Sequence, residues 1–378
     1  MKILITTGIF PPDIGGPATY VSKIAEEFVK HGHDVEVVTY SDKKTAEDKD
    51  YGVCRVVRSG NLFWRYFKYF IVVFKKSARA DVIYVQDSVS AGLPTLLGNF
   101  LWRTPAVLKV VGDFAWEQAQ NQFGIRDDLD AFQHQKYDLK IEFWRRIEHL
   151  VAAKTRKIIV PSQYLKKIVS CWGQPDDKIK VVYNAFDEPD YIDESVEMPE
   201  GDVICTAGRL VAWKGMDTLI KIMPRLLEEN NNFRLLIIGN GPEKGNLENL
   251  VNNLGLGGRV ILKGLQPREK LLGYLKKSNM FVLNSSYEGF SHQILEAMWC
   301  NVPVAVSRVG GNPEVVEHEK NGLLFSYNNE DEIVDAILSI QKNDERKGRY
   351  KQQSREKLNN FSFPKMIEST INALKSVV

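Results

Sequence analysis

The chain has 378 residues, of which 44% are hydrophobic and 26% are charged, and its formal net charge is +2. This length exceeds the size at which one hydrophobic core usually stops growing, so two domains are expected. The small net charge argues against a nucleic-acid partner. The four cysteines form no CxxC pair and no metal-type spacing with histidine, so we expect reduced thiols in a cytoplasmic protein.

The first half of the chain contains short apolar runs that are typical of buried strands. They are residues 3–8, 34–40, 81–86, 106–112, 157–162 and 179–184. Segments with helical periodicity, such as residues 19–33, lie between most of these runs. Val, Ile and Leu runs that alternate with amphipathic helices predict buried parallel strands, and hence a doubly wound α/β domain.

The second half repeats this plan. Its strand-like runs are residues 202–209, 233–241, 259–264, 280–285, 302–307 and 322–327. We therefore predict two tandem Rossmann-like domains. Because ligands of such sheets bind at the carboxyl ends of the strands, the two domains are expected to face each other across a cleft that holds the substrate.

The domain boundary is predicted in the acidic and proline-containing segment 187–201. This gives an N-terminal domain over residues 1–187 and a C-terminal domain over residues 188–362. The amphipathic segment 363–378 is expected to be a helix that packs back on the first domain.

Two glutamates, Glu288 and Glu296, lie in the segment YEGFSHQILEAMW at residues 287–299. A strand ends just before it, a turn follows, and a helix begins near His292. Gly289 permits close backbone approach, and the N–H groups of a first helical turn can bind a diphosphate. Around such an anion, carboxylates serve as acceptors for neutral hydroxyls. A nucleotide sugar offers such hydroxyls on both sides of its diphosphate.

The Glu288-x7-Glu296 spacing after a strand resembles the signature of the retaining family 4 glycosyltransferases, which have the GT-B fold. Other segments resemble this family in the same order along the chain. They are IFPPDIGGPATYV, VVYNAFD, GRLVAWKG, IIGNGPE, LKGLQPREKLLGYLKKSNMFVLNS and SRVGGNPEVVEHEKNGLLF. The resemblance implies transfer of a hexose from a nucleoside-diphosphate sugar to an acceptor hydroxyl, with retention of configuration and no cofactor. Polysaccharide, glycolipid or lipid-linked glycan synthesis is the implied setting.

The resemblance also implies roles for four charged residues of the second domain. Arg209 and Lys214 would neutralise the donor diphosphate, Glu288 would hold hydroxyls of the transferred sugar, and Glu296 would bind the ribose. Charge reasoning agrees, because both cations follow a strand at its carboxyl end, where a leaving diphosphate gains negative charge. The alternatives are solvated loop cations and an acidic pair favoured only by the helix dipole. The coincidence of several motifs favours the functional interpretation.

Backbone and side-chain contacts complete the donor site that the resemblance implies. Its further members are Gly15, Gly16, Asn240, Gly241, Gly264, Leu265, Gly289, Phe290, Ser291 and Gly310. The loop with Gly15 and Gly16 lacks the GxGxxG spacing of a dinucleotide site, which argues against a nicotinamide cofactor.

Asp113 follows the strand-like run 106–112, where much of the family carries histidine and some members carry aspartate. Its carboxylate could bind a donor hydroxyl or stabilise positive charge at the anomeric carbon. It could equally cap the next helix, and both interpretations stay open. Glu117 is a weaker candidate for an acceptor contact. His292 could donate to a phosphate or lie on the surface.

The segment 61–80 interleaves aromatic and basic residues. Residues 51–109 contain nine Lys or Arg and two acids. Such a helix can lie on an anionic membrane surface, which would make the protein peripheral on the inner face of the membrane. Alternatively, it buries its aromatic face in the domain and keeps its cations as a solvated rim.

No DxD-type pair lies where a metal-dependent diphosphate site would need one, so the transfer is predicted to be metal-independent. Retention could proceed by front-face attack or through a covalent intermediate. Two other hypotheses are a nucleotide-sugar epimerase or sugar phosphorylase of the same fold, and a non-catalytic nucleotide-sugar binder.

Overall fold

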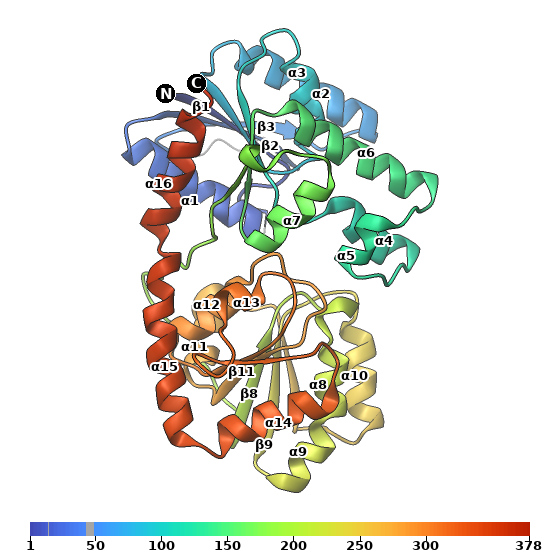
Figure 1. Ribbon diagram of the computed structural model, residues 1–378, viewed down its shortest axis with the longest axis vertical. Coiled ribbons are helices and arrows are strands. Elements are labelled where there is room, and N and C mark those ends of the chain that lie inside the picture. The colour runs from blue at the N-terminus through green and yellow to red at the C-terminus, as the bar shows by residue number, and fades with distance from the viewer. Residues whose placement is uncertain (14, 43–48) are drawn as a thin grey trace. The chain divides into compact units, whose positions relative to one another are not determined.

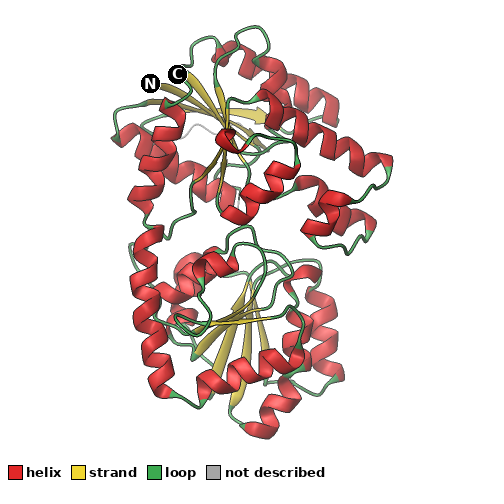
Figure 2. Ribbon diagram, in the orientation of Figure 1, coloured by secondary structure: helices red, strands yellow, loops and turns green. Residues whose placement is uncertain are grey.

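The structure is a computed structural model that describes residues 1–13, 15–42 and 49–378. It divides into two compact units, residues 1–183 with 364–378 (unit 1) and residues 184–363 (unit 2). In each unit the strands form a central layer between helices (Figure 2).

Unit 1 is built on a seven-stranded sheet in the order β3-β2-β1-β4-β5-β6-β7. Every neighbouring pair is parallel. The strands are β1 (Lys2–Thr7), β2 (Asp34–Ser41), β3 (Gly52–Val57), β4 (Val82–Val85), β5 (Ala106–Lys109), β6 (Lys157–Val160) and β7 (Ile179–Val181). The strand order reverses between β1 and β4, which is the topological switch point of a doubly wound sheet.

The helices of unit 1 include one that is far away in the sequence. They are α1 (Gly16–Lys30), α2 (Leu62–Ser77), α3 (Gly92–Gly98), α4 (Phe114–Phe123), α5 (Leu129–His134), α6 (Leu139–Lys154), α7 (Gln163–Cys171) and α16 (Phe363–Lys375). Helices α2, α3 and α6 lie side by side (Figure 1). In α16, which buries Met366, Ile367, Thr370, Ile371, Ala373 and Leu374, the apolar stripe faces the rest of unit 1. Just beyond this helix, Ser376 accepts a hydrogen bond from Lys157 at 2.9 Å.

Strand β3 was not predicted from the sequence. It lies at the edge of the sheet and pairs with β2 alone, and Val56 is its one buried residue. An edge strand is partly exposed, so it lacks the continuous apolar run by which the central strands are recognised.

Unit 2 is built on a six-stranded sheet in the order β10-β9-β8-β11-β12-β13, again with parallel pairs throughout. The strands are β8 (Asp202–Ala207), β9 (Phe233–Ile238), β10 (Val260–Gly264), β11 (Met280–Leu283), β12 (Val304–Ser307) and β13 (Leu323–Phe325). Each corresponds to one of the six runs predicted from the sequence. The switch point lies between β8 and β11, where the loops after the two strands diverge and leave room for a ligand.

The helices of unit 2 cover both faces of this sheet (Figures 1 and 2). They are α8 (Met216–Lys221), α9 (Met223–Glu229), α10 (Lys244–Asn253), α11 (Arg268–Lys276), α12 (His292–Trp299), α13 (Asn312–Val315), α14 (Glu330–Gln341) and α15 (Asp344–Leu358). Two parallel sheets wrapped by helices confirm the prediction of two Rossmann-like units. Within the described ranges, no helix combines the length and hydrophobicity needed to cross a bilayer.

The acidic segment 187–201 belongs to unit 2, and the change between units falls after Tyr183. The backbone N–H of Asp193 donates to the carbonyl of Glu269 on α11 at 3.2 Å, and Lys276 pairs with Glu194 at 2.6 Å. The segment therefore lies along α11.

The end of β9 approaches the end of β8 so closely that only glycine fits. Gly239 has φ +152°, and a Cβ built on it would lie 1.8 Å from the carbonyl oxygen of Gly208. This close approach brings the loops after β8 and β9 together.

Replacing Gly239 by alanine should therefore destabilise unit 2 by about 2 kcal/mol or more, because both the backbone and the Gly208 carbonyl would have to move. Gly245→Ala is the matched control. Gly245 lies in α10, and a Cβ built on it would meet no atom within 4 Å, so this change should be neutral or stabilise by about 0.5–1 kcal/mol. Urea unfolding followed by circular dichroism compares the two variants, and equal midpoints would contradict the prediction.

Candidate active site

The centre of the candidate site is an ion pair at the switch point of unit 2. Lys214 ends the 3₁₀ turn Ala212–Lys214 after β8, and Glu288 lies between β11 and α12. The Lys214 Nζ is 2.5 Å from the Glu288 Oε1. The two side chains are only 12% and 9% exposed, so their attraction is poorly screened by water.

The Glu288 carboxylate uses one oxygen for its protein contacts. Ser285 Oγ donates to the same Oε1 at 2.7 Å. No described residue donates to Oε2. Glu288 thus keeps one carboxylate oxygen for a further hydrogen-bond donor while its charge is balanced by Lys214.

The loop after β12 is fixed to the backbone of Glu288. The Gly311 N–H donates to the Glu288 carbonyl at 2.8 Å. Gly310 has φ +53°, and a Cβ on it would lie 2.0 Å from the same carbonyl oxygen. Gly310 is therefore required for this loop to approach Glu288.

A buried amide network ties the loop of Lys214 to the strand that precedes Glu288. Asn284 is 0% exposed, and its Nδ2 donates to the Gly215 carbonyl at 2.9 Å and to Asn328 Oδ1 at 2.7 Å. The Asn328 N–H returns a bond to Asn284 Oδ1 at 3.0 Å. Ser286 N–H donates to the Trp213 carbonyl at 2.7 Å. These bonds hold the two loops together independently of the ion pair.

Arg209 lies at the carboxyl end of β8 and is exposed to solvent. Its guanidinium forms no ion pair with any residue that the structure describes. The Lys214 side chain passes beside the neighbouring Gly208, with its Cε 3.7 Å from where a Cβ would be. The structure thus places an unpaired cation and a paired cation on one loop.

Glu296 lies on the second turn of α12 and is 8% exposed. Arg268, the first residue of α11, donates from its Nε to Glu296 Oε1 at 3.1 Å, and its Nη2 donates to the Asp187 carbonyl at 2.6 Å. Burial raises the pKa of Glu296, and the charge of Arg268 acts in the opposite direction. Arg268 therefore favours the charged carboxylate in a buried position.

The start of α12 carries the remaining predicted residues of this segment. Ser291 precedes the helix without capping it by a side-chain hydrogen bond, and the first turn contains no acid. Phe290 is 7% exposed and packs edge-on against Phe361, with ring centroids 5.3 Å apart. Gly289 is buried and His292 is exposed. The positive end of the helix dipole is thus not offset by an acid in the turn itself.

Backbone hydrogen bonds join the loops after β9 and β10 to this edge. The Leu210 N–H donates to the Asn240 carbonyl at 3.0 Å, and the Gly239 N–H donates to the Gly264 carbonyl at 2.9 Å. A Cβ on Gly241 would lie 2.2 Å from the Leu210 carbonyl oxygen. Asn240 and Leu265 are exposed. The predicted residues Asn240, Gly241, Gly264 and Leu265 thus lie at the carboxyl ends of β9 and β10.

Comparison with known proteins shows the family to which the chain belongs. The family model of glycosyl transferases group 1 matches residues 187–357, and that of Glycosyltransferase Family 4 matches residues 14–188. An uncharacterized glycosyltransferase of Methanocaldococcus jannaschii is 30% identical over 365 residues, which cover 90% of this chain and 89% of that protein. The chain belongs to the family 4 glycosyltransferases.

Two further comparisons concern this glycosyltransferase. The crystal structure of HepE from Anabaena in complex with UDP-glucose superposes with a TM-score of 0.78 at 19% identity, over 100% of both chains, and shares the GT-B fold. The GPI3 subunit of a phosphatidylinositol N-acetylglucosaminyltransferase from Saccharomyces cerevisiae is 23% identical over 332 residues, which cover 84% of this chain and 70% of that protein.

Three of the predicted residues of unit 1, Gly15, Gly16 and Glu117, lie at the starts of helices. Gly15 precedes α1 and Gly16 is its first residue. A Cβ on Gly16 would meet no atom within 4 Å, whereas one on Gly15 would lie 3.1 Å from Ile9 Cδ1. Glu117 lies in the first turn of α4.

Asp113 caps a helix in the glycosyltransferase. Its Oδ1 accepts from the Trp116 N–H at 2.8 Å and its Oδ2 accepts from Gln133 Nε2 at 2.9 Å, and the residue is 1% exposed. The sequence allowed Asp113 either to cap a helix or to contact the donor, and in the structure it caps α4.

A second buried carboxyl, Glu148 on α6, shares this cap. It accepts from the Phe114 and Ala115 N–H groups and from Ser88 Oγ, each at 2.9 Å. Burial, followed by repulsion from Asp113, raises the pKa of Glu148 well above its usual value, and burial also raises the pKa of Asp113. The two carboxyls therefore hold their protons more tightly in the folded state than in the unfolded chain.

Four contacts of the site were not predicted from the sequence. Ser285, Asn284, Asn328 and Arg268 hold the two glutamates and the loops around them. Ser285 lies three residues before Glu288 and could have been found from that spacing. Asn284 lies next to Ser285, but nothing local predicts that it bonds to Gly215 and Asn328. Arg268 and Asn328 are distant from both glutamates in sequence, and no periodicity points to them.

Two pairs of adjacent aspartates, Asp127–Asp128 and Asp176–Asp177, lie outside the candidate site, and three of the four residues have protein partners. Asp127 accepts from the Tyr137 hydroxyl at 2.6 Å, Asp128 caps α5, and Asp176 pairs with Lys166 at 2.8 Å. Across residues 1–13, 15–42 and 49–378, no three His, Cys, Asp or Glu side chains gather as metal ligands would. Metal independence remains a prediction.

Because the folded state holds the proton of Glu148 more tightly than the unfolded chain does, the stability of the protein depends on pH. This contribution to stability is full below pH 4.5, the ordinary pKa of glutamate, and is lost as the pH rises through the folded pKa. Unfolding free energy should fall by at most about 1.4 kcal/mol per pH unit in that window. In Glu148→Gln this decline should be smaller, because only the buried Asp113 carboxyl still contributes to it. Glu368→Gln, which changes an exposed carboxylate on α16, should keep the full decline. The free energy of unfolding is measured by urea unfolding at several pH values between 5 and 8. An equal change with pH in wild type and Glu148→Gln would refute the prediction.

Proposed function

We propose that this glycosyltransferase moves a hexose from a nucleoside-diphosphate sugar to an acceptor hydroxyl, with retention of configuration and without a metal ion. The observation that carries the proposal is the buried pair of Lys214 and Glu288 at the switch point of unit 2. A buried cation next to a carboxylate with one unused oxygen suits a substrate that is both anionic and rich in hydroxyls.

The diphosphate is assigned to Lys214, Arg209 and the start of α12. Arg209 has no competing ion pair among the described residues, and its planar guanidinium can form paired hydrogen bonds with phosphate oxygens. The first turn of α12 adds oriented backbone dipoles. As the bond to the sugar breaks, negative charge accumulates on the leaving diphosphate, and these groups stabilise it without a metal ion.

The hydroxyl groups at the two ends of the donor are assigned to the two glutamates. Glu288 Oε2 would accept from hydroxyls of the transferred sugar, and Glu296 would accept from the ribose. Each carboxylate has a cationic partner, Lys214 for Glu288 and Arg268 for Glu296. The exposed backbone near Asn240, Gly264 and Leu265 would contact the base.

Two retaining routes fit these assignments. In front-face attack, the acceptor oxygen forms the new bond on the side from which the diphosphate leaves, and a departing phosphate oxygen takes the acceptor proton. In the other route, a side chain on the opposite face forms a glycosyl-enzyme bond that the acceptor then replaces. Both require the same stabilisation of the leaving group.

The comparisons support a choice of substrates to test first. HepE of Anabaena is described in complex with UDP-glucose, so UDP-glucose is the first donor to try. The relative from Saccharomyces cerevisiae is named for a phosphatidylinositol acceptor, so glycolipid and lipid-linked acceptors belong in the panel beside free saccharides. Release of UDP only in the presence of an acceptor distinguishes a transferase from an epimerase or a non-catalytic binder.

Removing either member of the central pair should abolish most of the transfer. Lys214→Ala and Glu288→Gln should each lower kcat by about 10²–10³-fold, because Lys214 stabilises charge on the leaving diphosphate and Glu288 orients the transferred sugar. Lys221→Ala is the control, since Lys221 forms an exposed pair with Asp217 in the same unit. Rates of UDP release with the best acceptor measure the effect, and thermal unfolding verifies the fold. Wild-type rates in either variant would remove that residue from the site.

The pair of Glu296 and Arg268 should make UDP binding depend on pH. Removing Arg268 eliminates the charge that opposes the effect of burial, so the pKa of Glu296 should rise and its carboxylate should be lost at a higher pH. Calorimetric titration with UDP should show affinity falling as the pH decreases, with the fall displaced to higher pH in Arg268→Ala. Glu296→Gln should bind UDP about tenfold more weakly, and its affinity for UDP should not fall as the pH decreases. An unchanged pH profile in Arg268→Ala would exclude this coupling.

A further inference from the structure

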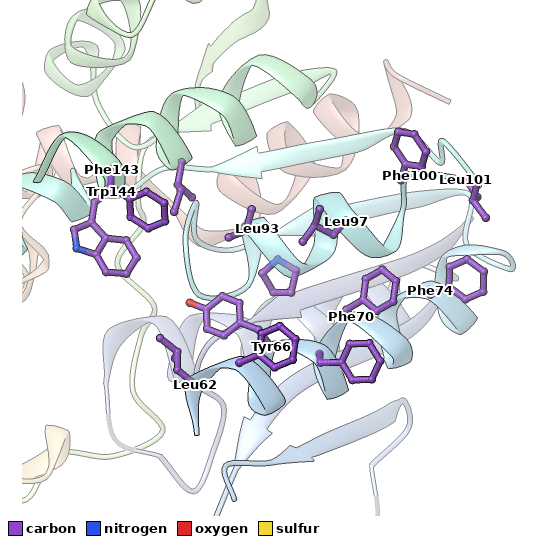
Figure 3. Close-up of a pocket in the computed structure, with 14 residues that line it drawn as sticks. Leu62, Tyr66, Phe70, Phe74, Leu93, Leu97, Phe100, Leu101, Phe143 and Trp144 are labelled. Carbon is purple, nitrogen blue, oxygen red and sulfur yellow. The ribbon is translucent and has the colours of Figure 1, made fainter. Parts of the chain in front are cut away.

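Unit 1 has a large apolar groove between α2, α3 and α6. Its volume is about 1040 Å³, and its lining residues are almost all apolar. Figure 3 shows it running along α3, from Leu62 and Trp144 at one end to Phe100 and Leu101 at the other. Phe100 and Leu101 are 73% and 67% exposed, so this end of the groove presents large apolar side chains to water.

A second hollow of about 790 Å³ adjoins the first. The two share Leu97 and Phe100 as lining residues. The second hollow reaches from Val85, the last residue of β4, to the starts of β5 and β6. Its charged lining residues are all cationic: Arg103, Lys154, Arg156 and Lys178. We call the continuous feature the α3 groove, with an apolar half and a cationic half.

The cations of the α3 groove are not neutralised within the described chain. Arg103, Lys154 and Arg156 are exposed, and none of the four forms an ion pair with a described residue. Lys178 donates to the Ala153 carbonyl at 2.9 Å and to Gln174 Oε1 at 3.0 Å, and both acceptors are neutral. The cationic half therefore favours an anion, while the apolar half favours hydrocarbon.

We propose that the α3 groove binds an anionic phospholipid of a bilayer, with an acyl chain along α3 and the phosphate among the four cations. Helix α2, which forms one wall, contains no acid and exposes Phe63, Trp64, Lys68 and Lys75. Aromatic and basic side chains mixed in this way suit the headgroup region of an anionic membrane. This surrounding surface favours a bilayer lipid over a water-soluble partner.

The position of the cationic half indicates that this lipid is not the acceptor of the transfer. Pro105 and Arg156 lie just before β5 and β6, at the amino ends of the strands. Substrates of a doubly wound sheet bind at the opposite, carboxyl edge. The lipid is therefore an anchoring ligand, and its binding does not depend on which sugar the enzyme transfers.

Vesicle flotation with the full chain tests the proposal. Wild type should float with phosphatidylcholine vesicles that contain 30% phosphatidylglycerol and stay in solution with phosphatidylcholine alone. Lys154→Glu/Arg156→Glu should lower the floated fraction at least about tenfold, and Leu97→Asn/Phe100→Asn should lower it similarly. Lys167→Glu/Lys375→Glu removes the same charge from exposed sites on α7 and α16 and should float as wild type does. Wild-type flotation of both groove variants would overturn the proposal.

A short-chain lipid distinguishes groove binding from adsorption to a charged surface. Dihexanoyl-phosphatidylglycerol, kept below its micelle concentration, should raise the melting temperature saturably in wild type and not in either groove variant. An equal shift by inorganic phosphate would mean an anion site without a hydrocarbon site, and would overturn the proposal. So would binding of an acidic amphipathic peptide by a protein that ignores the vesicles. UDP affinity should be unchanged in every groove variant, and no arm of the test requires transfer activity.

Discussion

The candidate site of unit 2 depends on the contact between Lys214 and Glu288. Either charge alone would be costly in such a confined position, because water reaches it poorly and cannot stabilise the charge fully. Together they neutralise each other and still retain one carboxylate oxygen and the remaining ammonium protons for a ligand. The contact also requires that the loops after β8 and β11 meet, and the parallel sheet ensures this by placing both loops at the switch point.

The surrounding structure fixes these loops before any substrate arrives. Asn284 and Asn328 bond to each other and to Gly215, and Gly310 allows the loop after β12 to reach the backbone of Glu288. Such preorganisation reduces the rearrangement needed when charge develops during the reaction. In unit 1, Asp113 and Glu148 serve a different purpose, since both carboxyls satisfy the start of α4.

The sequence predicts the features that repeat at regular intervals. Buried parallel strands appear as apolar runs, so all six strands of unit 2 were predicted, whereas the half-buried edge strand β3 was missed. The spacing of Glu288 and Glu296 identified the segment of the site, but the partners of these residues come from other loops. Arg268 precedes Glu296 by 28 residues, and neither local pattern nor composition indicates that the two side chains meet. Asp113 was ambiguous because capping and ligand binding favour the same residue at the same position.

Helix α16 has a consequence for biosynthesis. It buries six of its residues in unit 1, yet a ribosome makes it only after every residue of unit 2. During translation, the nascent N-terminal half must therefore wait with an uncovered apolar strip while its neighbour emerges and folds. Chaperones that recognise exposed hydrocarbon have their best opportunity in that interval, and a chain interrupted shortly before Phe363 would leave the strip permanently open to aggregation or degradation.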